Sequence, residues 1–400
     1  MLFEFDSLAE QKANLKVIGV GGAGGNAVNR MIQAGMKGVD FMVINTDAQD
    51  LENNAAENKI QIGKNLTKGL GAGAKAEIGK DAMDADKEVV KSIVEGADMV
   101  FITAGMGGGT GTGAAPIVAQ IARELGILTV GIVTLPFNFE GPKRMNRGLA
   151  GVTELRKACD TVIAIPNQKL MSIVDEDTTV VEAFKQADSI LHHASKGISD
   201  LINVHGLINL DFADVETVMK NMGEAVMGTG TASGQERAVL AAQQAISSPL
   251  LDNASVSGAQ GVLVNITGGA DLTLKEVDQA TSIIFDEAGK DANIIFGAVI
   301  DPSLNDEIMV TVIATGFNRK SMVEHLNPKH EDSNEIKQSD TQILSDKENL
   351  PLHEQSKEDA SIPKKKDTIE YKPAMLFDES NQPLYGNDLD VPAFIRRQQD

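Results

Sequence analysis

The sequence predicts an α/β protein in which a mostly parallel sheet is joined by a long helix to a smaller α+β domain. Short apolar, β-branched runs alternate with helix-period segments early in the chain, a pattern typical of a parallel sheet with helices on both faces. A helical apolar repeat then runs from 178 to 202, which is long for a globular helix. A second group of strand and helix candidates follows it.

Five apolar runs are the expected strands of the first sheet: 15–20, 41–44, 99–103, 128–134 and 161–165. In such sheets ligands bind beyond the carboxyl ends of the strands. Glycine clusters follow the first and third runs, at 21–25 and 107–113, and each precedes a helical pattern. Glycine lets backbone N–H groups approach an anion, and the following helix directs its positive dipole end at the same point. The two clusters together predict a site that holds a chain of phosphates from two sides.

The remaining segments divide by composition. The second domain has strand candidates at 261–267, 294–300 and 308–314 and helix candidates at 235–246 and 274–288. After 317 the chain mixes both charge signs with Pro and Gln, which is typical of disorder. The expected parts are an N-terminal extension (1–14), a nucleotide domain (15–176), a central helix (177–203), a second domain (204–317), a disordered linker (318–386) and a partner-binding peptide (387–400). An apolar island at 369–377 within the linker has no assigned role.

Charge and cysteine content exclude several classes of protein. The 36 Lys and Arg against 57 Asp and Glu give a net charge of −21, which repels a nucleic-acid backbone, so no nucleic-acid partner is expected. Cys159 is the single cysteine, which rules out an internal disulfide, and its place at the end of a helical pattern indicates a buried packing residue. Because no stretch reads as a signal peptide or a membrane span, we expect a cytoplasmic protein.

Five motifs taken together carry a family resemblance. They are Lys-Val-Ile-Gly-Val-Gly-Gly-Ala-Gly-Gly-Asn-Ala-Val at 16–28, Asn-Thr-Asp-Ala-Gln at 45–49, the glycine-rich run 105–113, Pro-Phe-Asn-Phe-Glu-Gly at 136–141 and Asn-Leu-Asp-Phe-Ala-Asp at 209–214. The combination resembles the FtsZ family of bacterial tubulin-like cell-division GTPases, from Lys16 to about Gly316 and again at the C-terminal tip. Ala23 departs from the pattern, because many relatives have glycine there. The resemblance implies a tubulin/FtsZ-like fold with a Rossmann-like GTPase domain.

The resemblance also implies a role for each cluster in binding GTP or GDP. Residues that would wrap the phosphates or reach toward the base or ribose are Gly22, Ala23, Gly24, Gly25 and Asn26. Those near the γ-phosphate would be Gly71, Ala72, Gly73 and Ala74, and those that would donate backbone and hydroxyl hydrogen bonds are Gly107, Gly108, Gly109, Thr110, Gly111 and Thr112. Residues that would hold the ribose are Glu140 and Arg144, and those that would contact guanine are Asn167, Asp188 and a stacked Phe184.

Chemistry supports Asp188 as the base-reading residue. A carboxylate accepts paired hydrogen bonds from the N1–H and the exocyclic amine of guanine, a pair of donors that adenine lacks. Without the resemblance, the pattern leaves open a solvated helix residue at Asp188 and a core residue at Phe184.

The phosphate charge needs a partner that the glycine clusters do not supply. No lysine follows either cluster directly, and the Gly-Lys pairs at 63–64, 79–80 and 289–290 lack the earlier glycine of a Walker loop. We therefore expect backbone dipoles and Mg²⁺, held mainly through the phosphate oxygens with no certain protein ligand. A monovalent cation is a further candidate cofactor.

The catalytic group is also missing from both glycine clusters. The resemblance implies that Asp211 and Asp214, with Asn209 orienting their loop, act on the GTP of a neighbouring subunit. Taken locally, Asp214 could instead be the N-cap of a helix over the residues that follow it.

The resemblance implies a head-to-tail homopolymer that forms the division ring. Heterologous contacts of this kind generate filaments when they do not close into a ring. Residues 390–397 would bind membrane anchors such as FtsA and, in some bacteria, ZipA, beside other division proteins and polymerisation regulators, and would place the filament beneath the inner membrane at midcell.

Two other functions fit parts of the sequence. An NAD-dependent dehydrogenase could use Gly19 to Gly24 as its G-x-G-x-x-G fingerprint and Asp47 as its ribose acid. The second glycine cluster and the lack of an evident His or Lys acid–base group count against this alternative. A nucleotide-binding scaffold without hydrolysis is the third possibility, which Asp211 and Asp214 disfavour.

Overall fold

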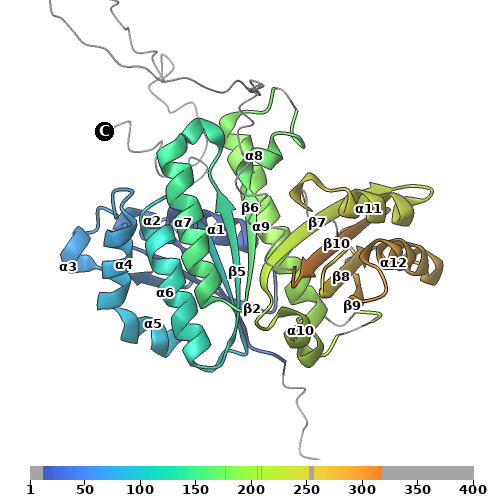
Figure 1. Ribbon diagram of the computed structural model, residues 1–400, viewed down its shortest axis with the longest axis horizontal. Helices are drawn as coiled ribbons and strands as arrows, with labels where there is room; N and C mark the ends of the chain where they lie inside the picture. The colour runs from blue at the N-terminus through green and yellow to red at the C-terminus, as the bar shows by residue number, and fades with distance from the viewer. Residues whose placement is uncertain (1–11, 176, 205, 209, 252–255, 318–400) are drawn as a thin grey trace, which may run out of the picture. The chain divides into compact units, whose positions relative to one another are not determined.

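The structure, a computed structural model, describes residues 12–317 except 176, 205, 209 and 252–255. It is built on one ten-stranded sheet in the order β3-β2-β1-β4-β5-β6-β7-β10-β8-β9 (Figure 1). The strands are β1 (Leu15–Val20), β2 (Val39–Asn45), β3 (Asn58–Gln61), β4 (Met99–Gly105), β5 (Leu128–Leu135), β6 (Thr161–Pro166), β7 (Gly223–Ser233), β8 (Gly261–Gly268), β9 (Asn293–Ile300) and β10 (Glu307–Thr315). Strands β1 to β7 run parallel, β8 pairs parallel with β9, and β10 runs antiparallel to both β7 and β8.

Twelve α-helices surround this sheet in the described part of the chain. They are α1 (Gly21–Gln33), α2 (Ala48–Glu52), α3 (Lys64–Thr67), α4 (Ala76–Ala85), α5 (Lys87–Val94), α6 (Thr110–Glu124), α7 (Pro142–Ala158), α8 (Asn167–Leu170), α9 (Val180–Asn203), α10 (Phe212–Met219), α11 (Arg237–Ile246) and α12 (Leu274–Ala288). Short 3-10 turns lie at Asn138–Glu140 and Pro249–Leu251.

Alternation along the strands sends side chains to both faces of the sheet, and each face has its own core. On one face Val17 and Phe101 pack with residues of α1, α9 and α10. On the other, Ile18 and Ile102 pack with residues of α4, α5, α6 and α7. A third core joins α11 and α12 to β8 and β10. Both faces of the parallel strands are therefore buried, as their continuous apolar runs predict.

The expected fold class is confirmed, and two strands were missed. The long helix starts at the capping box of Thr179 and Glu182, where each side chain bonds the other's backbone N–H. The missed strands are β3, which has four residues, and β7, which is rich in glycine. In β7, a Cβ on Gly228 would lie 2.0 Å from the carbonyl oxygen of Ala245, so glycine there lets α11 pack against the strand.

The two expected domains share this sheet. Three residue pairs between β6 and β7, beginning with Thr161 and Gly223, connect the strands of the nucleotide region to those of the second region. The expected boundaries at 14, 176, 203 and 317 stay predictions. The linker, its apolar island and the C-terminal peptide lie outside the described residues.

Cys159 is 3% exposed and is the C-cap of α7, which confirms a packing role. Burial raises the pKa of its thiol, so the group stays protonated and unreactive at neutral pH. Within the described residues, no helix is both long and apolar enough to cross a membrane.

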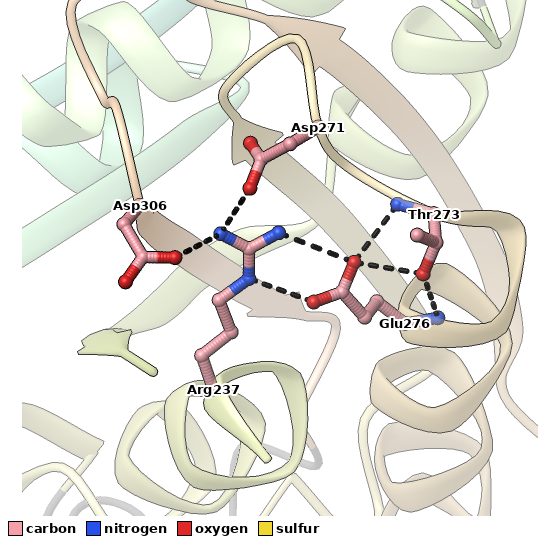
Figure 2. A network of polar contacts seen from close by, with 5 residues as sticks. All are labelled: Arg237, Asp271, Thr273, Glu276 and Asp306. Carbon is pink, nitrogen blue, oxygen red and sulfur yellow. Dashed lines mark hydrogen bonds and ion pairs between the residues drawn. The ribbon is translucent and has the colours of Figure 1, made fainter. Parts of the chain in front are cut away.

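Arg237, at the start of α11, connects three segments of the second region (Figure 2). Its Nε donates to Glu276 Oε1 at 2.7 Å, and its Nη1 lies 2.8 Å from Asp271 Oδ2 and 3.1 Å from Asp306 Oδ1. The hydrogen bond from Arg237 lowers the pKa of Glu276 to about 2, and the carboxylates raise the pKa of Arg237. The cluster fixes the first turn of α12 to that of α11.

We expect Arg237→Met to lower the free energy of unfolding by about 2 kcal/mol, because it removes hydrogen bonds between charged groups and leaves three carboxylates without their cation. Urea denaturation measures the change. Lys87→Met is the matched control, since the Lys87–Asp84 pair is exposed and should change stability by less than about 0.5 kcal/mol. Equal losses in the two variants would contradict a structural role for the Arg237 cluster.

Candidate functional site

A cavity of about 310 Å³ lies at the carboxyl ends of β1, β2 and β4. The first turns of α1, the loop at 105–109, the start of α6 and the 71–74 loop form its walls, together with residues of α7 and α9. The lining residues are Val20, Gly21, Gly22, Ala23, Asn26, Asn45, Asp47, Asp50, Gly71, Ala72, Gly73, Ala74, Gly105, Gly108, Gly109, Thr110, Gly111, Arg144, Phe184 and Asp188. Segments that are far apart in the sequence are thus brought to one site at the edge of the sheet.

The glycines let these loops approach one another closely. Gly21 has a φ of +73°, and a Cβ there would lie 2.8 Å from the backbone N of Gly111, so the two glycine clusters contact each other. A Cβ on Gly109 would lie 2.7 Å from the side chain of Ala72. At Gly108, by contrast, a Cβ would meet no heavy atom within 4 Å. The loop is therefore tightly packed behind Gly108 and open in front of it, as a phosphate cradle requires.

The two threonines of the second cluster have different surroundings. The Oγ1 atoms of Thr110 and Thr46 lie 2.7 Å apart, and Thr110 lines the cavity. Thr112 Oγ1 instead accepts a hydrogen bond from the backbone N–H of Gly107 at 2.9 Å, inside the loop itself. Thr112 lines a different cavity, of about 690 Å³, between α4, α6 and α7. The structure thus places Thr110, and not Thr112, at the expected phosphate site.

Six of the expected nucleotide-binding residues do not line the 310 Å³ cavity: Gly24, Gly25, Gly107, Thr112, Glu140 and Asn167. Glu140 has a supporting position, because its Oε2 lies 3.0 Å from Arg144 Nε, and Arg144 does line the cavity. Asn167 begins α8 at the end of β6, and its buried Oδ1 has no hydrogen-bond partner among the described residues. A buried acceptor without a donor is unfavourable, so a ligand donor at this position would be stabilising.

At the other end of the cavity, α1 and α9 face each other. Phe184 and Asp188 lie one turn apart on α9, and Asn26 lies on α1. The ring of Phe184 packs edge-on against Phe137 with centroids 5.3 Å apart. Burial raises the pKa of Asp188 to about 7, although Arg30, whose Nε is 3.8 Å from Asp188 Oδ2, opposes the rise. This end offers an aromatic face and a carboxylate to a planar base.

Three lining residues with polar side chains were not among the residues predicted for the GTP site: Asn45, Asp47 and Asp50. Asp47 accepts hydrogen bonds from the backbone N–H of Gln49 and Asp50 and so caps α2. Asn45 Nδ2 donates to Asp50 Oδ2 at 3.2 Å. The signal in the sequence was their place at the carboxyl end of β2 and just beyond it, at the same edge as the glycine clusters.

The predicted catalytic carboxylates lie elsewhere. Asp211 and Asp214 are exposed at the start of α10 and do not line the cavity. The far end of α10 contacts the amino ends of β6 and β8, because Met219 O accepts a hydrogen bond from Thr161 Oγ1 and Val218 lies against Gly261. This helix is therefore at the opposite edge of the sheet from the cavity. Asn209 lies outside the described residues.

The alternative interpretation of Asp214 as the N-cap of a helix is wrong. Asp211 is the N-cap of α10, and its Oδ1 accepts a hydrogen bond from the backbone N–H of Ala213. Asp214 lies in the first helical turn, where a carboxylate is stabilised by the helix dipole without a capping bond. Its side chain is therefore available to another molecule.

Metal ligands of the usual kind do not cluster in the part of the chain that the structure describes. No group of three or more His, Cys, Asp or Glu side chains there could hold a metal ion.

Comparison with family profiles gives two matches. Residues 14–175 match the Tubulin/FtsZ family GTPase domain, and residues 223–318 match the FtsZ family C-terminal domain. Together they include the strands β7 to β10 and all of the cavity lining except Phe184 and Asp188 on α9. Neither match is to a dehydrogenase, so the NAD-dependent alternative is not supported.

Comparison with solved structures agrees with these family matches. An empty FtsZ dimer from M. jannaschii is 45% identical, with a TM-score of 0.75, covering 77% of this chain and 90% of that one. A GTPγS-bound CetZ2 protofilament from Haloferax volcanii is 24% identical, with a TM-score of 0.66, covering 78% and 96%. A GDP-bound CetZ1 monomer from the same organism is 19% identical, with a TM-score of 0.67, covering 78% and 97%. The two CetZ likenesses show the fold alone.

Proposed function

This chain belongs to the tubulin/FtsZ family and is a GTPase, and from that premise we propose that it polymerises head to tail into division-ring filaments. In this proposal the catalytic site is completed between subunits. GTP occupies the cavity of one subunit, and Asp211 and Asp214 of the next position the attacking water and its cation. The dimer seen for the similar FtsZ from M. jannaschii supports self-association.

One observation carries the proposal. The exposed carboxylates of α10 lie at the opposite edge of the sheet from the cavity, so they cannot reach a nucleotide bound in their own subunit. Within the cavity, the carboxylates of Asp47 and Asp50 are already engaged, in capping α2 and in the bond from Asn45. Stacking two copies in the same orientation brings α10 of one to the cavity of the other. Such a contact does not close, and it generates a filament.

Dilution tests this proposal directly. If each active site needs two subunits, the rate of GTP hydrolysis per subunit should fall steeply as the protein is diluted below the concentration that supports contact. Phosphate release measured over a hundredfold dilution gives the result. A constant rate per subunit over that range would contradict a shared active site.

The phosphate groups would be held by backbone N–H groups at the start of α1 (21–26), in the 71–74 loop and at 108–111, where the second glycine cluster enters α6. We propose that Mg²⁺ binds chiefly to the phosphate oxygens, in keeping with its preference for few protein ligands, and that a monovalent cation joins it at the interface. The open space in front of Gly108 supports this placement, since an anion there meets no side chain.

Thr110→Ala should weaken GTP binding by about 0.5–1.5 kcal/mol, the usual range for a neutral hydrogen bond. The hydroxyl lies at the cavity wall beside Thr46, and its loss removes a donor aimed at the phosphates. Equilibrium binding of GDP measures the change without hydrolysis. Thr112→Ala is the matched control, because the Thr112 hydroxyl faces Gly107 and its loss should leave phosphate contacts intact. A weaker effect for Thr110→Ala than for Thr112→Ala would overturn the assignment.

Deleting residues 389–400 should leave GTP hydrolysis and polymerisation unchanged while abolishing recruitment to a membrane-bound anchor of the FtsA or ZipA type. The deleted segment contains two apolar residues, Phe394 and Ile395, followed by two basic residues, Arg396 and Arg397. This combination suits binding in a groove of a partner protein. Co-sedimentation with anchor-bearing vesicles measures recruitment. Retained recruitment, or loss of filaments in the truncated protein, would contradict this separation of roles.

A further inference from the structure

We propose that Arg30 is a positioning residue for nucleotide specificity, which keeps the carboxyl group of Asp188 ionised so that it can read guanine. The inference rests on the proposed function, in which Asp188 contacts the base. Two helices that face each other carry the two residues: Arg30 lies on α1 and Asp188 lies on α9. Arg30 Nε lies 3.8 Å from Asp188 Oδ2, and the two side chains are 28% and 16% exposed.

Arg30 lies behind the cavity and not in it. The lining residues include Asn26 and Asp188, whereas Arg30 is one turn beyond Asn26 on α1 and is absent from the walls. Its Nε is buried, makes no hydrogen bond within the described structure, and forms an ion pair with Asp188 Oδ2. Arg30 can therefore act on the base only through Asp188.

The ionisation of Asp188 decides what this wall can recognise. Guanine presents two donors, N1–H and the 2-amino group, and an ionised carboxylate accepts from both. A protonated carboxyl group turns one acceptor into a donor, which opposes one of these two hydrogen bonds. Adenine has an unprotonated N1 and a C2–H at the same place, so it gains nothing from the carboxylate. Loss of ionisation should therefore weaken guanine binding without weakening adenine binding, since adenine N1 can accept a hydrogen bond from the protonated carboxyl group.

Among the charged groups around the site, Arg30 is the one whose charge opposes the effect of burial on Asp188. Burial favours the neutral acid and raises the pKa of Asp188, while Arg30 lowers it. Charged or titratable groups around the site are Arg30 on α1, His192 one turn after Asp188 on α9, Asp47 and Asp50 by α2, and Arg144 on α7. Burial lowers the pKa of His192 to about 4, so that ring is neutral at physiological pH. Asp47 caps α2, Asp50 accepts from Asn45, and Arg144 is paired with Glu140, whereas Arg30 lowers the pKa of Asp188.

The sign of the pH dependence follows. Guanine binds the ionised form, so affinity for GDP should be full above the pKa of Asp188 and should fall up to tenfold per pH unit below it. An opposite charge within about 4–6 Å lowers a carboxyl pKa by roughly 1–3 units. Removing Arg30 should therefore move the midpoint of this fall upward by about 1–3 pH units.

The experiment measures dissociation constants of GDP and ADP from pH 5.5 to 9 for the parent, Arg30→Met, Arg30→Gln and Arg30→Lys. For Arg30→Met and Arg30→Gln we expect GDP binding at pH 7 to be weaker by about fivefold or more, a raised midpoint, and ADP binding that is not weakened. Arg30→Lys keeps the charge and should stay near the parent. A parallel loss at every pH, or loss of ADP binding as well, would show a merely structural role and overturn the proposal. Two neutral replacements guard against misfolding in either one.

Asp188→Asn separates this inference from the proposed function. An amide can accept from N1–H of xanthine and donate to its 2-oxo group, so this variant should prefer XDP to GDP. If Asp188→Asn keeps the parental preference, Asp188 does not read the base and the proposed site itself is wrong. If it switches to XDP while the Arg30 variants keep the parental pH midpoint, only the role of Arg30 is overturned.

Discussion

Asp214→Ala should lower the rate of GTP hydrolysis by about 100-fold or more while leaving the affinity for GTP unchanged. The residue is exposed in the first turn of α10 and does not line the cavity of its own subunit. In the proposed filament it acts on the nucleotide of a neighbour, where positioning of the attacking water is lost with the carboxylate. Phosphate release and equilibrium binding of GDP measure the two properties separately.

The control for Asp214→Ala is Glu216→Ala on the same helix. Glu216 forms an exposed ion pair with Lys220 at 2.7 Å, and such pairs contribute little to stability. The parental rate should therefore be retained in Glu216→Ala. Asp214→Ala should also inhibit the parent when the two are mixed, because each variant subunit disables a neighbour's site. Parental hydrolysis by Asp214→Ala would show that the residue only stabilises its own helix.

Gly108→Val should weaken the affinity for nucleotide by roughly 100-fold or more without unfolding the protein. A Cβ at this position meets no heavy atom within 4 Å, so the fold has room for a side chain. Gly108 nevertheless lines the cavity, and an isopropyl group there would occupy the space proposed for a phosphate. Titration with GDP gives the affinity, and the melting temperature tests the fold.

Gly108→Ala provides a graded comparison, with a smaller loss of affinity than valine. A steric cause predicts that the loss grows with side-chain size while the melting temperature stays near that of the parent. If both variants bind GDP normally, the phosphates do not pass in front of Gly108. If both unfold, the loop is a packing element and the phosphate cradle is wrong.

The strands of the first sheet were predictable because their chemistry is local. Runs such as 15–20 are mostly apolar, with β-branched Val17, Ile18 and Val20, since both faces of a parallel strand are buried. Strand β7 was missed for a reason that only the tertiary structure provides. Gly228 and Gly230 are needed where the carbonyl oxygens of Ala245 and Ala241 approach the strand, whereas glycine in a sequence otherwise indicates a turn.

Prediction of the site from the sequence was limited in the same way. Glycine loops at strand ends predicted where a cavity forms, and fourteen of the predicted nucleotide-binding residues line it. Sequence could not show that the Thr112 hydroxyl bonds the N–H of Gly107, because such a bond depends on how the loop closes. Nor could it show Arg30 facing Asp188, since these residues come from helices that are far apart in the chain.

The central claim, an active site shared between two subunits, is tested most directly by mixing Asp214→Ala with Gly108→Val. The first variant keeps its nucleotide cavity and lacks the catalytic carboxylate, whereas the second keeps the carboxylate and cannot bind GTP. Neither should hydrolyse GTP alone. In the mixture, Asp214 of the Gly108→Val subunit should act on GTP held by the Asp214→Ala subunit, so phosphate release should appear and rise with the concentration of both. A mixture that stays inactive, although the two variants are shown to associate, would contradict the claim.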